Sequence, residues 1–183
     1  MKIITGIYRN RNIDIIKKNN IRPTKNIVRE AIFNIIPKKN IENKIILDLF
    51  AGCGSLGIEA ISRMAKTVYF VDINIEAIKI IFKNLKKLNI KNAIVIKNDF
   101  LKACKYFKKN KIKFDTILLD PPYNFSEKKY NDIFTFFKQN ELLNNNYVFV
   151  FETAFELNIN DNDCIIKKYK YGKTFVCIII KND

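Results

Sequence analysis

Two short stretches of the chain combine residue types that could carry chemistry. The first, residues 48–57, reads DLFAGCGSLG, so three glycines follow an apolar run. The second, residues 120–123, reads DPPY and follows another apolar run at 116–119. A glycine turn between a strand and a helix lets the backbone approach a nucleotide-like ligand closely. The combination of the two stretches points to methyl transfer onto an amino group of a nucleobase.

The second stretch suits an exocyclic amine, whose lone pair is delocalised into the ring and is therefore a poor nucleophile. The Asp120 carboxylate can accept one hydrogen bond from the amine, and the Pro121 carbonyl can accept the other. Pro121 and Pro122 fix φ and remove two backbone donors, while Tyr123 offers a ring for an unstacked base. Such alignment needs no histidine base, and the chain has no histidine. The alternative is a structural turn that happens to contain two prolines and is packed by the tyrosine.

The glycine turn predicts the cofactor site. Gly52 and Gly54 would let the backbone pass close to a ligand, and Gly57 would let the following helix pack tightly on its strand. Asp72 lies 20 residues after Gly52. That spacing places a carboxylate at the end of the next strand, where it can accept hydrogen bonds from ribose hydroxyls.

A second acid, Asp99, follows the third expected strand and could accept a hydrogen bond from an adenine amine, with Phe100 as an apolar wall. Asp99 could instead be only a helix N-cap, and Asp48 could simply cap a turn. The same glycine turn would also suit a nicotinamide dinucleotide, but the DPPY stretch favours a methyl donor. We assign these residues to the cofactor site: Asp48, Phe50, Gly52, Gly54, Gly57, Asp72, Asp99 and Phe100.

Strands and helices alternate from residue 45 onward, and these elements must position the two stretches. Strands are expected at 45–49, 67–71, 93–96, 115–119, 147–152, 164–169 and 174–180. Helices are expected at 57–64, 75–88, 99–107 and 126–137. The pattern predicts an α/β fold, a doubly wound and mostly parallel seven-stranded sheet that ends in an antiparallel hairpin. Ligands of such sheets bind beyond the carboxyl ends of the strands, where the strand order reverses.

Residues 1–40 are expected to form a small basic hairpin and helix extension ahead of a cofactor-binding domain at 41–183. This segment holds ten basic and two acidic side chains, in a chain of net charge +15. Ile, Lys and Asn make up 85 of the 183 residues, which fits an A/T-rich genome and discounts much of the lysine excess. Four of the five arginines fall in the first 29 residues, and arginine suits phosphates and base edges.

Within this extension we expect short strands at 2–8 and 12–17, joined by a basic turn. A helix should follow, with Thr24 as its N-cap, Pro37 after its end and Arg29 on its polar face. The polyanionic partner expected for such a segment is a nucleic acid. We assign the nucleic-acid contacts to these residues: Arg9, Arg11, Arg22, Thr24 and Arg29.

Size and composition exclude several classes of protein. A chain of 183 residues with 48% hydrophobic residues can bury one sizeable core and is not disordered. No apolar run approaches the roughly 20 residues that cross a bilayer. The four cysteines show no CxxC spacing, so neither a disulfide framework nor a metal site is expected. We expect a monomeric, cytoplasmic protein without a membrane partner.

The glycine turn with the later DPPY stretch resembles the S-adenosylmethionine-dependent, Rossmann-like methyltransferases that act on base amino groups. IRPT at 21–24, VRE at 28–30 and IFN at 32–34 resemble signatures of the bacterial 16S ribosomal RNA guanine-N2 methyltransferases, which modify guanine 966. The resemblance covers nearly the whole chain in the same order. The sequence departs from the family at Thr5, where a glycine is usual, and at Cys53, where a small polar residue is usual.

The resemblance implies S-adenosylmethionine as the cofactor and an unstacked guanine held by Asp120, Pro121 and Tyr123. It also implies 16S ribosomal RNA as the partner, within a small ribosomal subunit particle. The DPPY stretch itself does not name the base, so adenine-N6 or cytosine-N4 methylation of DNA or RNA is an alternative. A catalytically silent RNA-binding assembly factor is another alternative, which the intact Asp120 and glycine turn disfavour.

Overall fold

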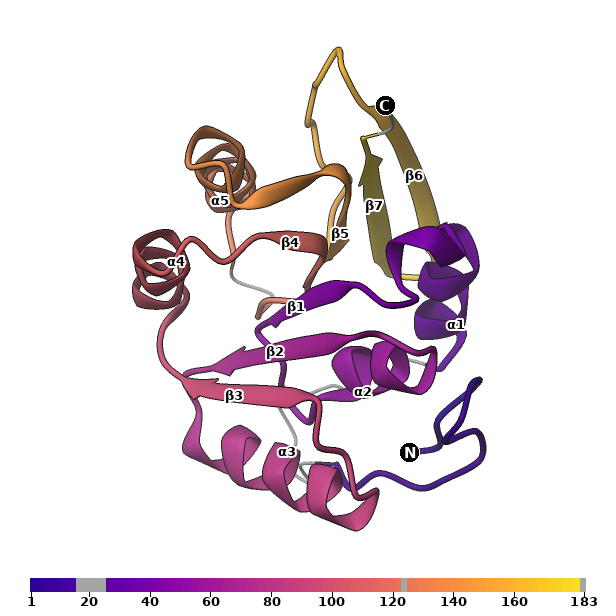
Figure 1. The fold of residues 1–183 in the computed structure, drawn as a ribbon. Helices are drawn as coiled ribbons and strands as arrows, with labels where there is room; N and C mark the ends of the chain where they lie inside the picture. The colour runs from indigo at the N-terminus through magenta and orange to yellow at the C-terminus, as the bar shows by residue number, and fades with distance from the viewer. Residues whose placement is uncertain (16–25, 123–124, 182–183) are drawn as a thin grey trace.

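The computed structural model describes residues 1–15, 26–122 and 125–181, so Arg22, Thr24 and Tyr123 lie outside the described residues. Its centre is one seven-stranded sheet with the strand order β3-β2-β1-β4-β5-β7-β6 (Figure 1). The strands are β1 (Ile45–Leu49), β2 (Thr67–Asp72), β3 (Ala93–Lys97), β4 (Phe114–Leu119), β5 (Leu143–Thr153), β6 (Ile165–Tyr171) and β7 (Thr174–Ile180). β1 to β5 pair in parallel, whereas β7 pairs antiparallel with β5 and with β6. The predicted fold class is confirmed.

Helices cover both faces of the sheet (Figure 1). They are α1 (Asn26–Ile35), α2 (Ser55–Ser62), α3 (Ile75–Lys87), α4 (Phe100–Lys109) and α5 (Glu127–Gln139), with a 3₁₀ turn η1 at Lys38–Asn40. Apolar side chains of α1, α2 and α3 pack into one core, and those of α4 and α5 pack into a second core on the opposite face. No helix in the described parts of the chain has the length and apolarity needed to cross a membrane.

Local signals in the sequence explain most helix starts. Asn74 caps α3, where its side chain accepts a hydrogen bond from the Glu76 backbone N–H at 2.9 Å. The helix after the glycine turn begins at Ser55, two residues before the predicted start at Gly57. Ile27, an apolar residue of α1, is 71% exposed. The strand order reverses between β1 and β4, so the predicted ligand edge lies where these two strands end.

The two strands predicted at 2–8 and 12–17 are not formed in the described part of that segment, which contains one isolated bridge, Lys2 with Asn12. The loop is hairpin-like, because the Ile3 N–H donates to the Arg11 carbonyl at 3.0 Å and the Ile13 N–H donates to the Met1 carbonyl at 2.8 Å. Other backbone donors of this N-terminal loop bond to α2. The Ile7 N–H donates to the Ser62 carbonyl at 2.9 Å, and the Tyr8 N–H donates to Ser62 Oγ at 3.0 Å.

Gly6 allows this close approach of the N-terminal loop to α2. Its φ is +88°, and a Cβ at this position would lie 1.8 Å from the Ser62 carbonyl oxygen. Thr5, the departure from the family pattern, is exposed and bonds to α2 through its backbone N–H. This turn therefore requires a glycine at position 6, whereas position 5 tolerates a threonine.

Candidate cofactor and base-binding site

The glycine turn follows β1, and several of its residues adopt the left-handed backbone conformation. Gly52 has φ +55° and Gly54 has φ +79°, conformations that glycine adopts without strain. Phe50 has φ +82°, which is rare for an aromatic residue and which the sequence did not signal. The turn is held because the N–H groups of Phe50 and Ala51 both donate to the Val71 carbonyl, at 3.0 and 2.9 Å.

Asp72 fastens the turn from the neighbouring strand. One of its carboxylate oxygens accepts from the Gly52 N–H and the other from the Asn74 N–H, both at 2.8 Å. Burial raises the pKa of Asp72, although these backbone donors oppose the shift. Its position at the end of β2 is as predicted, and its contact with a ribose stays a prediction. The structure adds a second task, which is to fix the glycine turn.

Asp48 lies beneath the turn and is 1% exposed. Its carboxylate accepts a hydrogen bond from the Gly57 N–H at 2.8 Å. Burial raises the pKa of Asp48 to about 7, and the negative charges of Asp120 and Asp72 add to the increase. The three acids therefore lie close enough to influence one another. Asp48 supports the turn from below, as the simple turn-capping alternative anticipated.

Gly57 allows α2 to pack on the sheet, as predicted. A Cβ at this position would lie 2.2 Å from the ring of Phe70, and 3.0 Å from an Asp48 carboxylate oxygen. Phe70 is fully buried, so its ring has no free space into which it could move. Only glycine keeps the start of α2 at this distance from β2.

Asp99 is the N-cap of α4, where its side chain accepts from the Lys102 N–H at 3.0 Å. This hydrogen bond lowers the pKa of Asp99 and keeps the carboxylate ionised. The capping alternative for Asp99 is therefore confirmed, and a contact with adenine stays a prediction. Such a contact is compatible with capping because the carboxylate has a second oxygen.

Three phenylalanine rings form a triangle beside these acids. The ring centroids of Phe50 and Phe100 are 5.5 Å apart, and the centroid of Phe125 lies 5.3 and 5.6 Å from them. The rings come from the ends of β1, β3 and β4, so this apolar wall joins the glycine turn to the DPPY stretch. Phe50 and Phe100 belong to the predicted cofactor residues. Phe125 was missed, because an aromatic residue in a loop carries no distinctive spacing.

Asp120 follows β4, and the register of β1 on β4 pairs Leu49 with Leu119. Phe50 and Asp120 therefore each follow the last residue of a paired strand. The DPPY stretch and the glycine turn thus meet at one edge of the sheet. Pro121 is buried and Pro122 is exposed, and the Pro122 carbonyl accepts from the Phe125 N–H at 3.0 Å.

Tyr130 is a further residue near Asp120 that the sequence did not indicate. It lies on the buried face of α5, its ring centroid is 5.1 Å from that of Phe125, and its hydroxyl donates to the Glu152 carbonyl at 3.2 Å. Burial raises the pKa of Tyr130, and the Asp120 charge adds to the increase. Tyr130 therefore stays neutral, and its ring packs against Phe125 beside the DPPY stretch.

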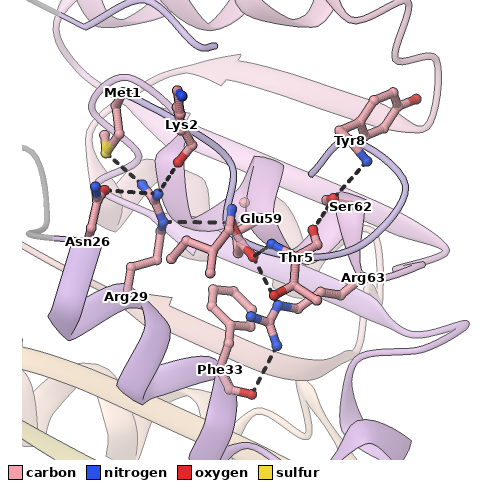
Figure 2. A network of polar contacts seen from close by, with 12 residues as sticks. Met1, Lys2, Thr5, Tyr8, Asn26, Arg29, Phe33, Glu59, Ser62 and Arg63 are labelled. Carbon is pink, nitrogen blue, oxygen red and sulfur yellow. Dashed lines mark hydrogen bonds and ion pairs between the residues drawn. The ribbon is translucent and has the colours of Figure 1, made fainter. Parts of the chain in front are cut away.

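The prediction that Arg29 lies on an exposed polar face is wrong. Its side chain is 1% exposed, and its Nε lies 3.7 Å from a carboxylate oxygen of Glu59 on α2. Figure 2 shows its guanidinium directed at Met1, the Lys2 carbonyl and Asn26. Such a buried guanidinium is not accessible to RNA, and it joins α1 to the N-terminal loop instead.

Glu59 is the other half of this buried network. Its two oxygens accept from the backbone N–H groups of Ile4 and Thr5, at 2.9 and 3.0 Å (Figure 2). The Arg63 side chain also donates to Glu59, at 3.1 Å. No pattern in the sequence signals this acid, which lies one turn after Ser55 on a mostly apolar helix. It links the N-terminal loop to the helix that leaves the glycine turn.

Arg9 and Arg11 are exposed at the turn of the N-terminal loop. This turn lies against Ser62, the last residue of α2, because Ile7 and Tyr8 bond there. α2 begins at the glycine turn, so the two arginines lie near its far end. A nucleic acid that reaches both these arginines and Asp120 must extend along the length of α2.

Comparisons with known proteins agree with this geometry. The profile of a family described as Conserved hypothetical protein 95 matches residues 1–180. A Buchnera aphidicola protein named ribosomal RNA small subunit methyltransferase D is 38% identical, over 94% of this chain and 87% of its own. The Bacillus subtilis putative rRNA methyltransferase YlbH is 35% identical, over 99% of both chains. The solved structure of the Escherichia coli putative methyltransferase yhhF has a TM-score of 0.82 and 24% identity, over 100% of this chain and 98% of that chain.

Proposed function

Because this chain belongs to the Conserved hypothetical protein 95 family, we propose that it methylates the N2 amino group of a guanine in small-subunit ribosomal RNA. The methyl donor is S-adenosylmethionine. The observation that carries the proposal is the meeting of the glycine turn and the DPPY stretch at one edge of the sheet, in a chain whose relatives are named as ribosomal RNA methyltransferases.

The residues at this edge fit the donor. A sulfonium donor carries one more positive than negative charge, and three acids, Asp48, Asp72 and Asp120, lie near one another here. A cation beside them lowers the raised pKa values of Asp48 and Asp72, so the acids favour a cationic ligand over a neutral one. Backbone with positive φ at Gly52 and Gly54 leaves room for close approach, and the phenylalanine triangle offers an apolar wall to a purine.

Asp120, Pro121 and Tyr123 would act on the target base. When bound, the donor supplies an electrophilic methyl group on a sulfonium. The Asp120 carboxylate accepts a hydrogen bond from the guanine amine and the Pro121 carbonyl accepts a second, so that the nitrogen lone pair is directed at the methyl group. Tyr123 would stack on the unstacked base. Asp120 is within reach of the donor because β1 and β4 are neighbours.

Residues 1–40 would serve as an RNA-contacting extension of the methyltransferase domain at 41–183. We infer that the substrate is a small-subunit particle, bound by a monomer in the cytoplasm. The positive net charge of +15 supports a polyanionic partner. Arg29 is buried and is not part of this contact surface. Arg9 and Arg11 are exposed, and we propose that they contact RNA.

The paired substitution of Arg9 and Arg11 by Ala should weaken RNA binding. The dependence of log Kobs on log salt concentration should become shallower by up to ~0.9 per lost phosphate contact. The measurement is RNA binding over a range of salt concentrations, with Lys108→Ala and Lys109→Ala as the control pair of equal charge, because these exposed lysines end α4, outside residues 1–40. A slope equal to that of the wild type would mean that the loop does not touch phosphates.

Binding of S-adenosylhomocysteine separates an enzyme from a silent assembly factor. The folded chain should be stabilised by the ligand, because binding to the native state adds RT ln(1 + [L]/Kd) to the free energy of unfolding. A thermal melt with and without S-adenosylhomocysteine measures this, and NAD serves as the control ligand. An unchanged midpoint at saturating S-adenosylhomocysteine would contradict an enzymatic role.

A further inference from the structure

The turn between β6 and β7 lies at the same edge of the sheet as the DPPY stretch. Strand register shows this, because Leu119 pairs with Phe151, Phe151 with Cys177, and Cys177 with Lys168. The next row outward holds Asp120 and Tyr169, three strand spacings apart, or about 14 Å between their backbones. Lys170 and Tyr171 lie farther out still, at the end of β6.

Charge is distributed unevenly along this hairpin. Residues 165–174 contain four lysines and no acid. Asp161 and Asp163 lie before β6, at the opposite edge of the sheet, where Asp161 pairs with Lys138 and Asp163 lies 4.0 Å from Lys181. Glu156 is the acid that lies near the hairpin, beside Lys168. A uniform genomic bias toward lysine does not explain why the positive charge gathers at the end that faces the base site.

The lysines at that end are available to a ligand. Lys167, Lys170 and Lys173 are exposed, and none of them forms an ion pair with a residue that the structure describes. The fourth lysine, Lys168, lies 3.4 Å from Glu156. The Lys170 Nζ is held 5.2 Å from the centroid of the Phe175 ring.

Two aromatic rings project from the face of β6 that packs toward α1, and because side chains alternate along a strand, Lys167 shares this face and Lys170 lies on the other. Tyr169 and Tyr171 are half-buried, and their rings are stacked with centroids 6.4 Å apart and planes 23° apart. They pack against the core under α1, which runs beside β6 and β7 (Figure 1). Fixed aromatic rings among cations are the arrangement on which proteins stack single-stranded bases while holding the phosphates.

We infer that this hairpin-edge surface, formed by Lys167, Tyr169, Lys170, Tyr171 and Lys173, binds the RNA strand that flanks the target nucleotide. The inference rests on the proposed function, because it needs the target base at Asp120. The lysines contact the phosphates, and the tyrosines give bases a surface on which to stack. This second contact lies at the edge of the sheet that holds Asp120, whereas the N-terminal loop lies near the far end of α2, so the RNA is held at two separate places.

The test is the triple substitution of Lys167, Lys170 and Lys173 by Ala in the full chain. The salt slope of binding to a small-subunit ribosomal RNA fragment should become shallower by ~0.7 to 0.9 per lost contact. With S-adenosylmethionine present, KM for RNA should rise while kcat stays near that of the wild type, because these lysines position the strand and do not touch the amine. Tyr171→Phe should bind RNA as the wild type does.

The matched control replaces Lys108, Lys109 and Lys111 by Ala. These lysines are exposed at the end of α4, which leads back to the opposite edge of the sheet, and their substitution removes the same charge. The control should keep the wild-type slope. Equal slopes for the wild type and the hairpin variant, or equal losses in both triple variants, would overturn the inference. If the wild type transfers no methyl group, the proposed function fails, and the binding slopes still decide whether RNA uses this surface.

Discussion

Substitution of Asp120 by Ala should lower kcat for RNA methylation by about 10²- to 10³-fold, the loss typical when one preorganised contact to a developing charge is removed. The carboxylate is the acceptor that directs the amine lone pair, and no histidine in the chain could replace it. Affinity for S-adenosylhomocysteine should change little, because the glycine turn and Asp72 remain in place. The measurement is single-turnover methyl transfer together with calorimetric titration of S-adenosylhomocysteine.

Asp120→Asn is the matched variant, since its side chain keeps one acceptor oxygen without the charge. It should retain more activity than Asp120→Ala. Turnover by Asp120→Ala equal to that of the wild type would remove Asp120 from the chemistry. A parallel loss of S-adenosylhomocysteine binding would show that Asp120 mainly supports the cofactor.

Substitution of Arg29 by Ala should destabilise the fold by about 3–5 kcal/mol, the cost typical of breaking a buried ion pair by removing one partner. Glu59 would lose a buried positive neighbour, and the Lys2 carbonyl and Asn26 would lose a donor. Urea unfolding measures this as a lower midpoint. RNA affinity, measured under conditions in which the variant is folded, should equal that of the wild type, because the lost charge is buried.

Glu30→Ala is the control for this substitution. Glu30 is the next residue on α1 and is exposed, so its removal should change the free energy of unfolding by no more than about 0.5 kcal/mol. An Arg29→Ala protein with an unchanged midpoint and weaker RNA binding would contradict the buried role and restore the sequence-based assignment.

The fold and the edge that carries the site could be predicted because local signals and topology agree. The glycine turn, the Asn74 cap and the alternating apolar runs each act within a few residues, and the expected strands 45–49 and 174–180 match β1 and β7 in the structure. A parallel sheet then forces the ends of β1 and β4 to one edge. The position of Asp120 beside the glycine turn is therefore predictable from the sequence alone.

The errors came from contacts between residues far apart in the chain. Arg29 reads as an exposed helix residue because its partner, Glu59, lies 30 positions later on another helix. The N-terminal loop reads as two strands, but it forms one isolated bridge, and several of its backbone donors bond to Glu59 and Ser62 of α2. The positive φ of Phe50 depends on the Val71 carbonyl of the next strand. No periodicity within a short window reports such partners.

The central claim is that the edge formed by the glycine turn and Asp120 transfers methyl groups to guanine N2 in small-subunit ribosomal RNA. Small-subunit particles from cells that lack this gene should be incubated with the protein and S-adenosylmethionine, digested to nucleosides and analysed by mass spectrometry. The account predicts new N2-methylguanosine with the wild type and almost none with Asp120→Ala. The appearance of N6-methyladenosine or N4-methylcytidine instead, or of no methylated nucleoside, would contradict it.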